Sequence, residues 1–95
     1  MTTLQIEHGV RDYDRWKAAF DGDPVGREAG GVRSYRIARH ADDPNRVRID
    51  LDFDTTGKAE AFHDRLRTMW AEAAADLGLE NPSARVLEMM ESKTY

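Results

Sequence analysis

Three histidines are the groups in this 95-residue chain whose ordinary pKa lies near neutral pH, and histidine is the commonest acid–base residue in enzymes. His8 alternates with Leu4 and Ile6, so a strand here would point all three side chains to one face. His63 follows Phe62 in a predicted helix. If both imidazoles enter one apolar cleft, one of them could act as a general base on an acidic phenol or enol. The alternative is that His8 ends a strand at the surface and His63 borders the core, bound to water.

Aromatic and basic side chains could complete a site around these histidines. Deprotonation of a substrate would form an oxyanion, which Tyr35 or Arg36 could stabilise. Three large rings of the predicted helices, Trp16, Phe62 and Trp70, would line a substrate pocket if the core is incompletely filled. Ordinary core packing is the competing interpretation of the same rings.

A metal site is a second possibility for the histidines. Its ligands would be His8 and His63 with a carboxylate such as Glu7 or Asp12, brought together by the tertiary fold. The chain has no pair of metal-binding side chains four residues apart on one helix, which is a common zinc arrangement. We therefore expect no metal and no other cofactor.

Two carboxylates form a further candidate pair. Asp50 and Asp52 alternate along a predicted strand, so they lie on one face about 7 Å apart. Paired carboxylates at such a spacing can divide acid and base roles, as in glycosidases. The neighbouring Arg48 favours a different interpretation, a salt-bridged surface. His40 stands beside a predicted turn, and we expect its side chain to be solvated.

The composition excludes several classes of function. The net charge is −4 and charges of both signs are mixed along the chain, so no basic patch is present for nucleic acid. Cysteine is absent, which excludes disulfides, thiolate nucleophiles, zinc ribbons and iron–sulfur clusters. No apolar run approaches the roughly 18 residues of a membrane-spanning helix, and the first residues do not resemble an export signal. We expect a cytoplasmic protein that binds neither nucleic acid nor membrane.

A β-hairpin between residues 31 and 55 is the clearest structural pattern in the chain. In its second strand, apolar and charged residues alternate: Val47, Ile49, Leu51 and Phe53 with Arg48, Asp50, Asp52 and Asp54. A turn is predicted over residues 41–45, where proline fixes φ and the Asp and Asn side chains can bond their own backbone. The apolar face of this strand must lie against the helices, because burying unpaired carboxylates there would be costly.

The facing of the hairpin's first strand depends on the length of its loop. A two-residue loop would place Tyr35 and Ile37 on the polar face with Arg33 and Arg39. A three-residue loop would instead place Tyr35 and Ile37 in the core, with Arg36 and Ala38 outside. A one-residue slip exchanges every side chain between the faces. We favour Tyr35 and Ile37 in the core, because this strand has no other bulky apolar pair.

The remaining elements follow from caps and periodicity. We predict a strand over residues 3–10, then a helix capped by Asp12 that ends at Asp21–Gly22 with Gly22 in the left-handed conformation. A second helix begins at Thr55 or Thr56 and is closed by Gly78. After a turn at 81–82, a last strand is predicted over residues 84–91.

The element order β-α-β-β-α-β predicts one ferredoxin-like α+β domain over residues 1–95, with an antiparallel sheet in strand order 4-1-3-2. Both helices would cover one face of the sheet. Because Arg48, Asp50 and Asp52 would lie on the other face, we expect two copies to pair there. That homodimer would be an α/β barrel; a monomer with a solvated sheet face is the alternative.

The chain resembles the dimeric α/β-barrel superfamily, and within it a group of small bacterial proteins near the antibiotic-biosynthesis-monooxygenase-like domains. The segments that carry the resemblance are residues 10–17, 30–32, 42–45, 52–55 and 61–62. They are a helix start, a glycine bend, a hairpin turn, a strand end and part of a helix, and the resemblance covers nearly the whole chain.

The resemblance implies a ligand cavity lined by aromatic side chains between the sheet and the helices. The superfamily includes cofactor-independent quinone-forming monooxygenases, polyketide cyclases and haem-degrading enzymes. In the haem degraders a histidine ligand has Asn and Trp partners; His63 and Trp70 are present here, but Leu4–Ile6 contains no Asn. The expected function is therefore a cofactor-independent, monooxygenase-like or cyclase-like enzyme for an aromatic or polyketide-type substrate. The alternative is a non-catalytic ligand-binding or assembly domain.

Overall fold

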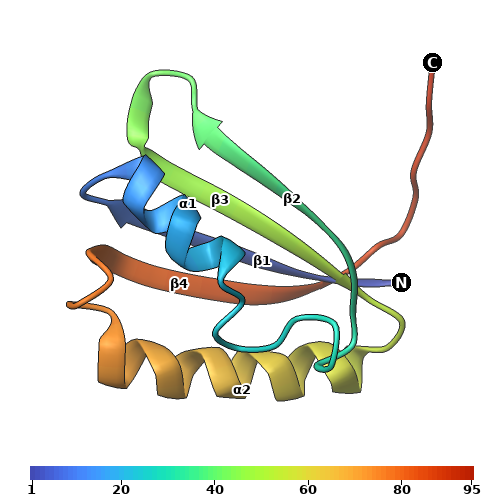
Figure 1. Ribbon diagram of the computed structural model, residues 1–95. Helices are drawn as coiled ribbons and strands as arrows, with labels where there is room; N and C mark the ends of the chain where they lie inside the picture. Colours follow the sequence, from blue (N-terminus) through green and yellow to red (C-terminus); the bar gives the residue numbers. More distant parts are fainter.

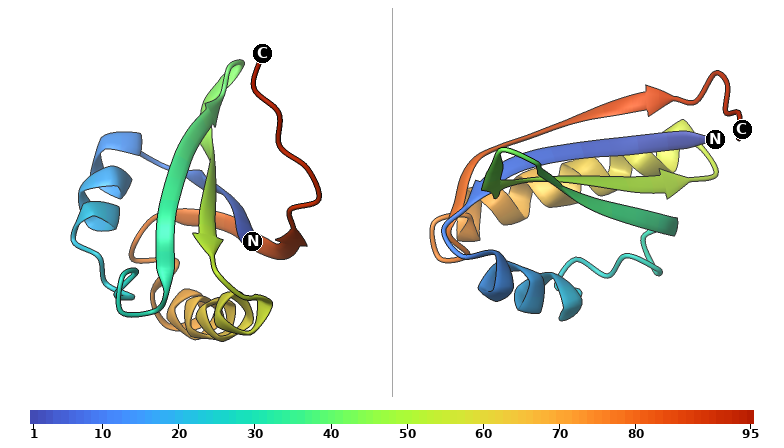
Figure 2. Two further views of the ribbon diagram at one scale, coloured as in Figure 1. Left: turned by 90° about the vertical axis from the view of Figure 1, so that its right-hand side faces the viewer. Right: turned by 90° about the horizontal axis from the view of Figure 1, so that it is seen from above.

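The computed structural model describes residues 1–95 and has the expected element order, β-α-β-β-α-β. The four strands form one antiparallel sheet in the order β2-β3-β1-β4, so the predicted ferredoxin-like topology is confirmed. The elements are β1 (Thr2–Val10), α1 (Tyr13–Asp21), β2 (Val32–His40), β3 (Asp43–Phe53), α2 (Thr56–Ala73) and β4 (Leu79–Glu88). The sheet is twisted, and both helices lie on the same side of it (Figures 1 and 2).

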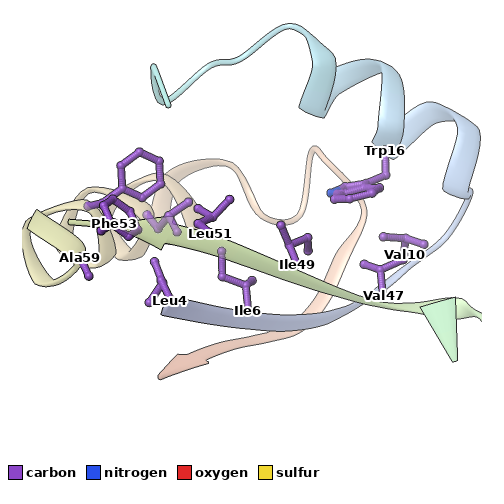
Figure 3. Packing of buried hydrophobic residues seen from close by; sticks show 11 residues of the cluster. Leu4, Ile6, Val10, Trp16, Val47, Ile49, Leu51, Phe53 and Ala59 are labelled. Carbon is purple, nitrogen blue, oxygen red and sulfur yellow. The ribbon is translucent and has the colours of Figure 1, made fainter. Parts of the chain in front are cut away.

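The core lies between the two central strands and the helices. Alternate residues of β1 and β3 point into it, and α1 and α2 add side chains from the opposite side (Figure 3). The buried hydrophobic cluster consists of Leu4, Ile6, Val10, Trp16, Val47, Ile49, Leu51, Phe53, Ala59, Phe62 and Leu66. The apolar face predicted for the second hairpin strand is therefore confirmed.

Both helices begin at the predicted caps. The Asp12 carboxylate accepts hydrogen bonds from the backbone N–H groups of Asp14 and Arg15, at 3.0 and 3.3 Å. The Thr55 hydroxyl accepts from the N–H of Lys58 at 3.2 Å. Neither helix combines the length and apolarity that a membrane crossing requires.

The end of α1 differs from the prediction in one respect. The helix ends at Asp21, as expected, but Gly22 is right-handed with φ −68°. The left-handed residue is instead Asp23, with φ 53°. The Asp23 carboxylate accepts from the N–H of Arg27 at 2.8 Å, which ties down the start of the connection to β2.

The end of α2 and the start of β4 were placed wrongly by the sequence analysis. The helix ends at Ala73, a series of turns follows, and Gly78 with φ 71° precedes the strand. β4 therefore begins at Leu79 rather than at residue 84. Asn81–Pro82 is not a turn between elements but a bulge within this edge strand, where a missing N–H is tolerated.

The register of the hairpin places Tyr35 opposite Leu51 and Ile37 opposite Ile49, so both side chains face the helices. This agrees with the favoured alternative. The turn itself is shorter than predicted, because β3 already begins at Asp43. The pairing then shifts from His40–Asp43 to Arg39–Val47, so residues 44–46 have no partner on β2. Tyr35 keeps 44% exposure, since β2 is an edge strand and α1 covers it incompletely.

The opposite face of the sheet is polar and internally paired. The Asp52 carboxylate accepts from Thr3 Oγ1 at 2.8 Å, from Ser34 Oγ at 2.7 Å and from Arg36 Nη1 at 2.8 Å. Asp50 accepts from the Arg48 guanidinium at 3.1 and 3.0 Å. Both carboxylates are buried beneath these partners. They serve as ion-pair centres of the sheet, which argues against the acid–base pair considered from their spacing.

The connection between α1 and β2 passes close to α2 at Gly30. A Cβ at this position would lie 2.6 Å from Cδ2 of Phe62, a ring that is itself buried, and 2.9 Å from Arg65 Nη1. We expect Gly30→Ala to lower the free energy of unfolding by about 1–3 kcal/mol, because the added methyl group would overlap a buried ring and one of the two must shift. Gly57→Ala is the matched control, since a Cβ there meets nothing within 4 Å and alanine favours the helix. Urea unfolding of both variants measures the difference, and equal stabilities would contradict this packing.

The partners of Asp52 predict a specific response to acid. Hydrogen bonds from Arg36, Ser34 and Thr3 lower the pKa of Asp52 from 3.8 to about 2. Its contribution to stability is therefore fully present above pH 4 and is lost as the pH falls through 2. We expect Asp52→Asn to cost about 1–3 kcal/mol at pH 7, and the difference from the wild type to shrink below pH 4.

Asp54→Asn is the control for this measurement. Asp54 is half-exposed and its carboxylate lies 3.8 Å from the Arg33 guanidinium, so its replacement should change the free energy of unfolding little. Urea unfolding at several pH values between 2 and 7 tests the pair. A constant difference between wild type and Asp52→Asn over that range would show that the carboxylate is not titrating as expected.

Candidate functional site

A cavity of about 80 Å³ lies between α1, α2 and the helix-covered face of the sheet. Its wall is apolar except for three ionisable side chains, His8, Asp23 and Arg27. The predicted rings of Trp16, Phe62 and Trp70 line it, together with Phe20, Met69 and aliphatic side chains of β1 and β3. The core is thus incompletely filled, as a ligand pocket would require.

The cavity is small for a ligand site. Pockets for drug-sized molecules have volumes of about 300–1,000 Å³, and an engineered apolar cavity that binds benzene has about 150 Å³. Even a ligand of one ring must therefore displace lining side chains. Met69, Trp70 and Phe20 are only partly buried, so these are the side chains with room to move.

His8 supplies the cavity's one imidazole. It is 3% exposed, and its ring meets that of Trp16 edge-on at a centroid distance of 5.4 Å. Nδ1 lies 3.1 Å from the carbonyl oxygen of Gly9. A carbonyl can only accept, so Nδ1 carries the proton and Nε2 holds the free lone pair. Nε2 has no hydrogen-bond partner in the chain, so its lone pair is free to accept a proton.

The environment of His8 favours the neutral imidazole. Burial lowers its pKa below the ordinary 6.5; the hydrogen bond to Gly9 opposes this shift, and the positive charge of Arg46 adds to it. A neutral ring with a free Nε2 can accept a proton at pH 7. In chemical terms it is suited to act as a general base.

The bulge in β4 lies directly across from His8. Pairing passes from Glu7–Ser83 to Gly9–Glu80, so Asn81 and Pro82 together face His8. Gly9 also approaches β4 closely, since a Cβ there would lie 3.1 Å from Cβ of Glu80. The alternation of apolar and polar residues does not predict this bulge. The one indication in the sequence is the Asn-Pro pair, from which a turn was predicted.

The second predicted histidine does not join the first. His63 is half-buried on α2 and does not line the cavity, because Phe62 and Leu66 occupy the inward face of the helix. His40 is exposed and its Nε2 lies 3.2 Å from Glu7. The proposed pair of His8 and His63 is therefore not assembled in this structure.

Arg36 and Tyr35 lie on opposite faces of the sheet. Arg36 binds Asp52 on the polar face, so the predicted role as an oxyanion partner in the cavity is wrong. Tyr35 faces the helices but remains at the rim, where its ring meets Phe20 edge-on at 5.2 Å. It borders the outer groove rather than the cavity.

The considered metal ligands also lie apart. Asp12 caps α1, and Glu7 lies beside His40 and Arg46. The structure contains no group of three or more His, Asp or Glu side chains that could hold a metal ion.

The element order and the sheet define a ferredoxin-like α+β fold, and the solved structures that are similar to this chain include proteins described as candidate antibiotic biosynthesis monooxygenases. No family model matches the sequence, and a search of curated proteins finds no match. Solved structures match over nearly the whole chain at sequence identities that establish the fold alone.

Three solved structures illustrate the likeness. A candidate antibiotic biosynthesis monooxygenase from Deinococcus radiodurans is 16% identical with a TM-score of 0.66, covering 100% of this chain and 98% of its own. A dimeric ferredoxin-like protein from an uncultured marine organism is 7% identical with a TM-score of 0.65, covering 99% and 98%. A mutant of MhuD with two manganese protoporphyrin IX bound per active site is 10% identical with a TM-score of 0.68, covering 98% and 99%.

The neutral state of His8 can be tested by titration. Because its pKa lies below 6.5, the unfolded chain takes up a proton that the folded chain refuses as the pH falls below 6.5. We expect the stability of the wild type to decrease from pH 7.5 to 5.5 through this group, and His8→Gln to remove that part of the decrease. Nitrogen-15 NMR of the ring should show protonated Nδ1 and unprotonated Nε2. A midpoint above 6.5 would contradict the assignment.

Proposed function

We propose that this protein is a homodimeric, cofactor-independent enzyme of the monooxygenase-like or cyclase-like kind, acting on an aromatic or polyketide-type substrate. The observation that carries the proposal is His8, a neutral histidine with an unpartnered Nε2 that lines a mainly apolar cavity. The cytoplasmic location expected from the sequence stays a prediction.

The proposed chemistry begins with a proton transfer. A phenol or enol in the cavity gives its proton to Nε2 of His8, and the resulting imidazolium keeps its Nδ1–H bond to the Gly9 carbonyl. The substrate is left as an electron-rich anion in an apolar enclosure that excludes water. Such an anion can react with dioxygen, which is monooxygenase-like chemistry, or with an electrophilic carbon of its own chain, which is cyclase-like chemistry.

A homodimer through the polar face of the sheet is supported by two observations. The face carries arginines and aspartates that lie close enough to pair, and Arg36 and Arg48 remain about half exposed above them. Among similar structures, two are described as dimeric ferredoxin-like proteins. Docked face to face, the half-exposed guanidinium groups of the two copies would lie in the interface.

A non-catalytic binding or assembly domain is the second candidate. The observation in its favour is the volume of the cavity, about 80 Å³, because Trp16, Phe20, Phe62 and Met69 occupy most of the space between helices and sheet. A single buried histidine could then serve packing through its contact with Trp16. The two candidates differ in whether the cavity admits a molecule that His8 can deprotonate.

Native mass spectrometry and an oxygen-uptake assay together test the proposal. We expect a dimer in the first measurement, with or without a bound molecule of discrete mass. In the second, phenols and anthrones of one to three rings are supplied under air, and His8→Gln should lower kcat by about 10²–10⁴-fold with little change in KM. His63→Gln is the matched control, since His63 does not line the cavity. Turnover that His8→Gln leaves unchanged would refute the role of His8.

A further inference from the structure

Arg27 stands between the cavity and the solvent. It belongs to the connection from α1 to β2 and lines both the apolar cavity and an open groove outside it. Its side chain is 18% exposed, and Cζ lies 3.9 Å from the centroid of the Phe20 ring and 5.1 Å from that of Tyr35. The two rings hold the guanidinium of a residue that lines both the cavity and the groove.

The guanidinium is fixed in position but only partly used. Nη1 donates to the carbonyl oxygen of Phe20 at 2.8 Å, and this is the one hydrogen bond the side chain makes, although a guanidinium carries five N–H donors. The nearest carboxylate oxygen, Oδ1 of Asp23, is 3.6 Å from Nη1 and accepts instead from the backbone N–H of Arg27 at 2.8 Å. No polar atom of Arg27 is sealed without a partner, so its free donors are accessible to a ligand.

The groove around these donors has more positive than negative side chains. Arg33 and Lys58 line it with Arg27, against the carboxylates of Asp23 and Glu28. Arg33 is itself 66% exposed and 3.8 Å from Asp54, so it is a solvated charge. Arg27, in contrast, is held by two rings and is largely shielded from water. Because water and salt screen a shielded charge least, Arg27 should attract an anion more strongly than Arg33 does.

We propose that the ligand of this cavity is an aromatic carboxylate, with its ring among the apolar side chains and its carboxylate on the free N–H donors of Arg27. This inference rests on the proposed function in one respect, the use of the same cavity, and adds the substrate class. A planar guanidinium matches a carboxylate through two parallel hydrogen bonds. Because Phe20, Tyr35 and the Phe20 carbonyl already hold Arg27, little rotamer freedom is lost on binding.

Phenylacetate and phenylacetamide test the proposal directly. They have the same shape and differ in charge, and a single ring requires the least displacement of the side chains that line the cavity. We expect NMR titration to show that the wild type binds phenylacetate at least tenfold more tightly than phenylacetamide. Arg27→Gln should abolish the preference, so that the affinities for phenylacetate and phenylacetamide become equal. Arg33→Gln, in the same groove, should keep the tenfold preference.

Three other outcomes would each contradict a different part of the proposal. Equal binding of the two molecules by the wild type overturns the anion site and leaves the proposed use of the cavity standing. Equal loss of preference in Arg27→Gln and Arg33→Gln overturns the assignment to Arg27 in favour of general electrostatic attraction. Binding of neither molecule overturns the cavity as a ligand site, and the proposed function with it.

A second variant covers the case in which Arg27→Gln does not fold. Arg27→Lys keeps the positive charge and loses the planar pair of donors, so the preference for phenylacetate should fall by about twofold to threefold without disappearing. Thermal unfolding establishes that each variant is folded before it is titrated. An Arg27→Lys protein with the full wild-type preference would contradict the two-bond geometry.

Discussion

Strand β3 carries two surfaces that cannot exchange places, and the arrangement of the whole sheet depends on this. One face supplies Val47, Ile49, Leu51 and Phe53 to the core, and the other supplies Asp50 and Asp52. A shift of one residue would bury both carboxylates among apolar side chains and expose the core residues. The strand lies between β2 and β1, so its register determines theirs. Asp52 enforces the same register from the polar side, because its donors come from both neighbouring strands.

The candidate site arises from this same alternation. His8 continues the inward series of Leu4 and Ile6 on β1, and so an imidazole is buried where an aliphatic residue would fill the core. The neighbouring space between the helices and the sheet remains open as a cavity. The carbonyl of Gly9 then decides which ring nitrogen keeps the proton. A candidate catalytic group thus results from one polar residue in an apolar series, beside a bulge of the adjacent strand.

The sequence predicts the features that depend on neighbouring residues, but not those that depend on how helices and strands pack together. Element order, both helix caps and the facing of Tyr35 follow from periodicity and turn chemistry, and all three are found in the structure. Tyr35 and Arg36 could never share one site, because neighbours on a strand face opposite ways. The placement of His63 depends on the rotation of α2 about its axis, and Phe62 and Leu66 decide that rotation by burial. The start of β4 was missed because Asn-Pro is as typical of a bulge as of a turn.

The bulge at Asn81–Pro82 also determines how this sheet can meet other proteins. β4 is an edge strand, and an edge normally offers a row of free N–H and C=O groups to any extended chain that approaches. Pro82 contributes no N–H, and the left-handed Asn81 bends the backbone away from a straight ladder. Continuation of the sheet by an added strand, the route by which many small β proteins form fibrils, is therefore blocked along the middle of β4. A second molecule can still dock on the polar face of the sheet, and docking there does not extend the sheet.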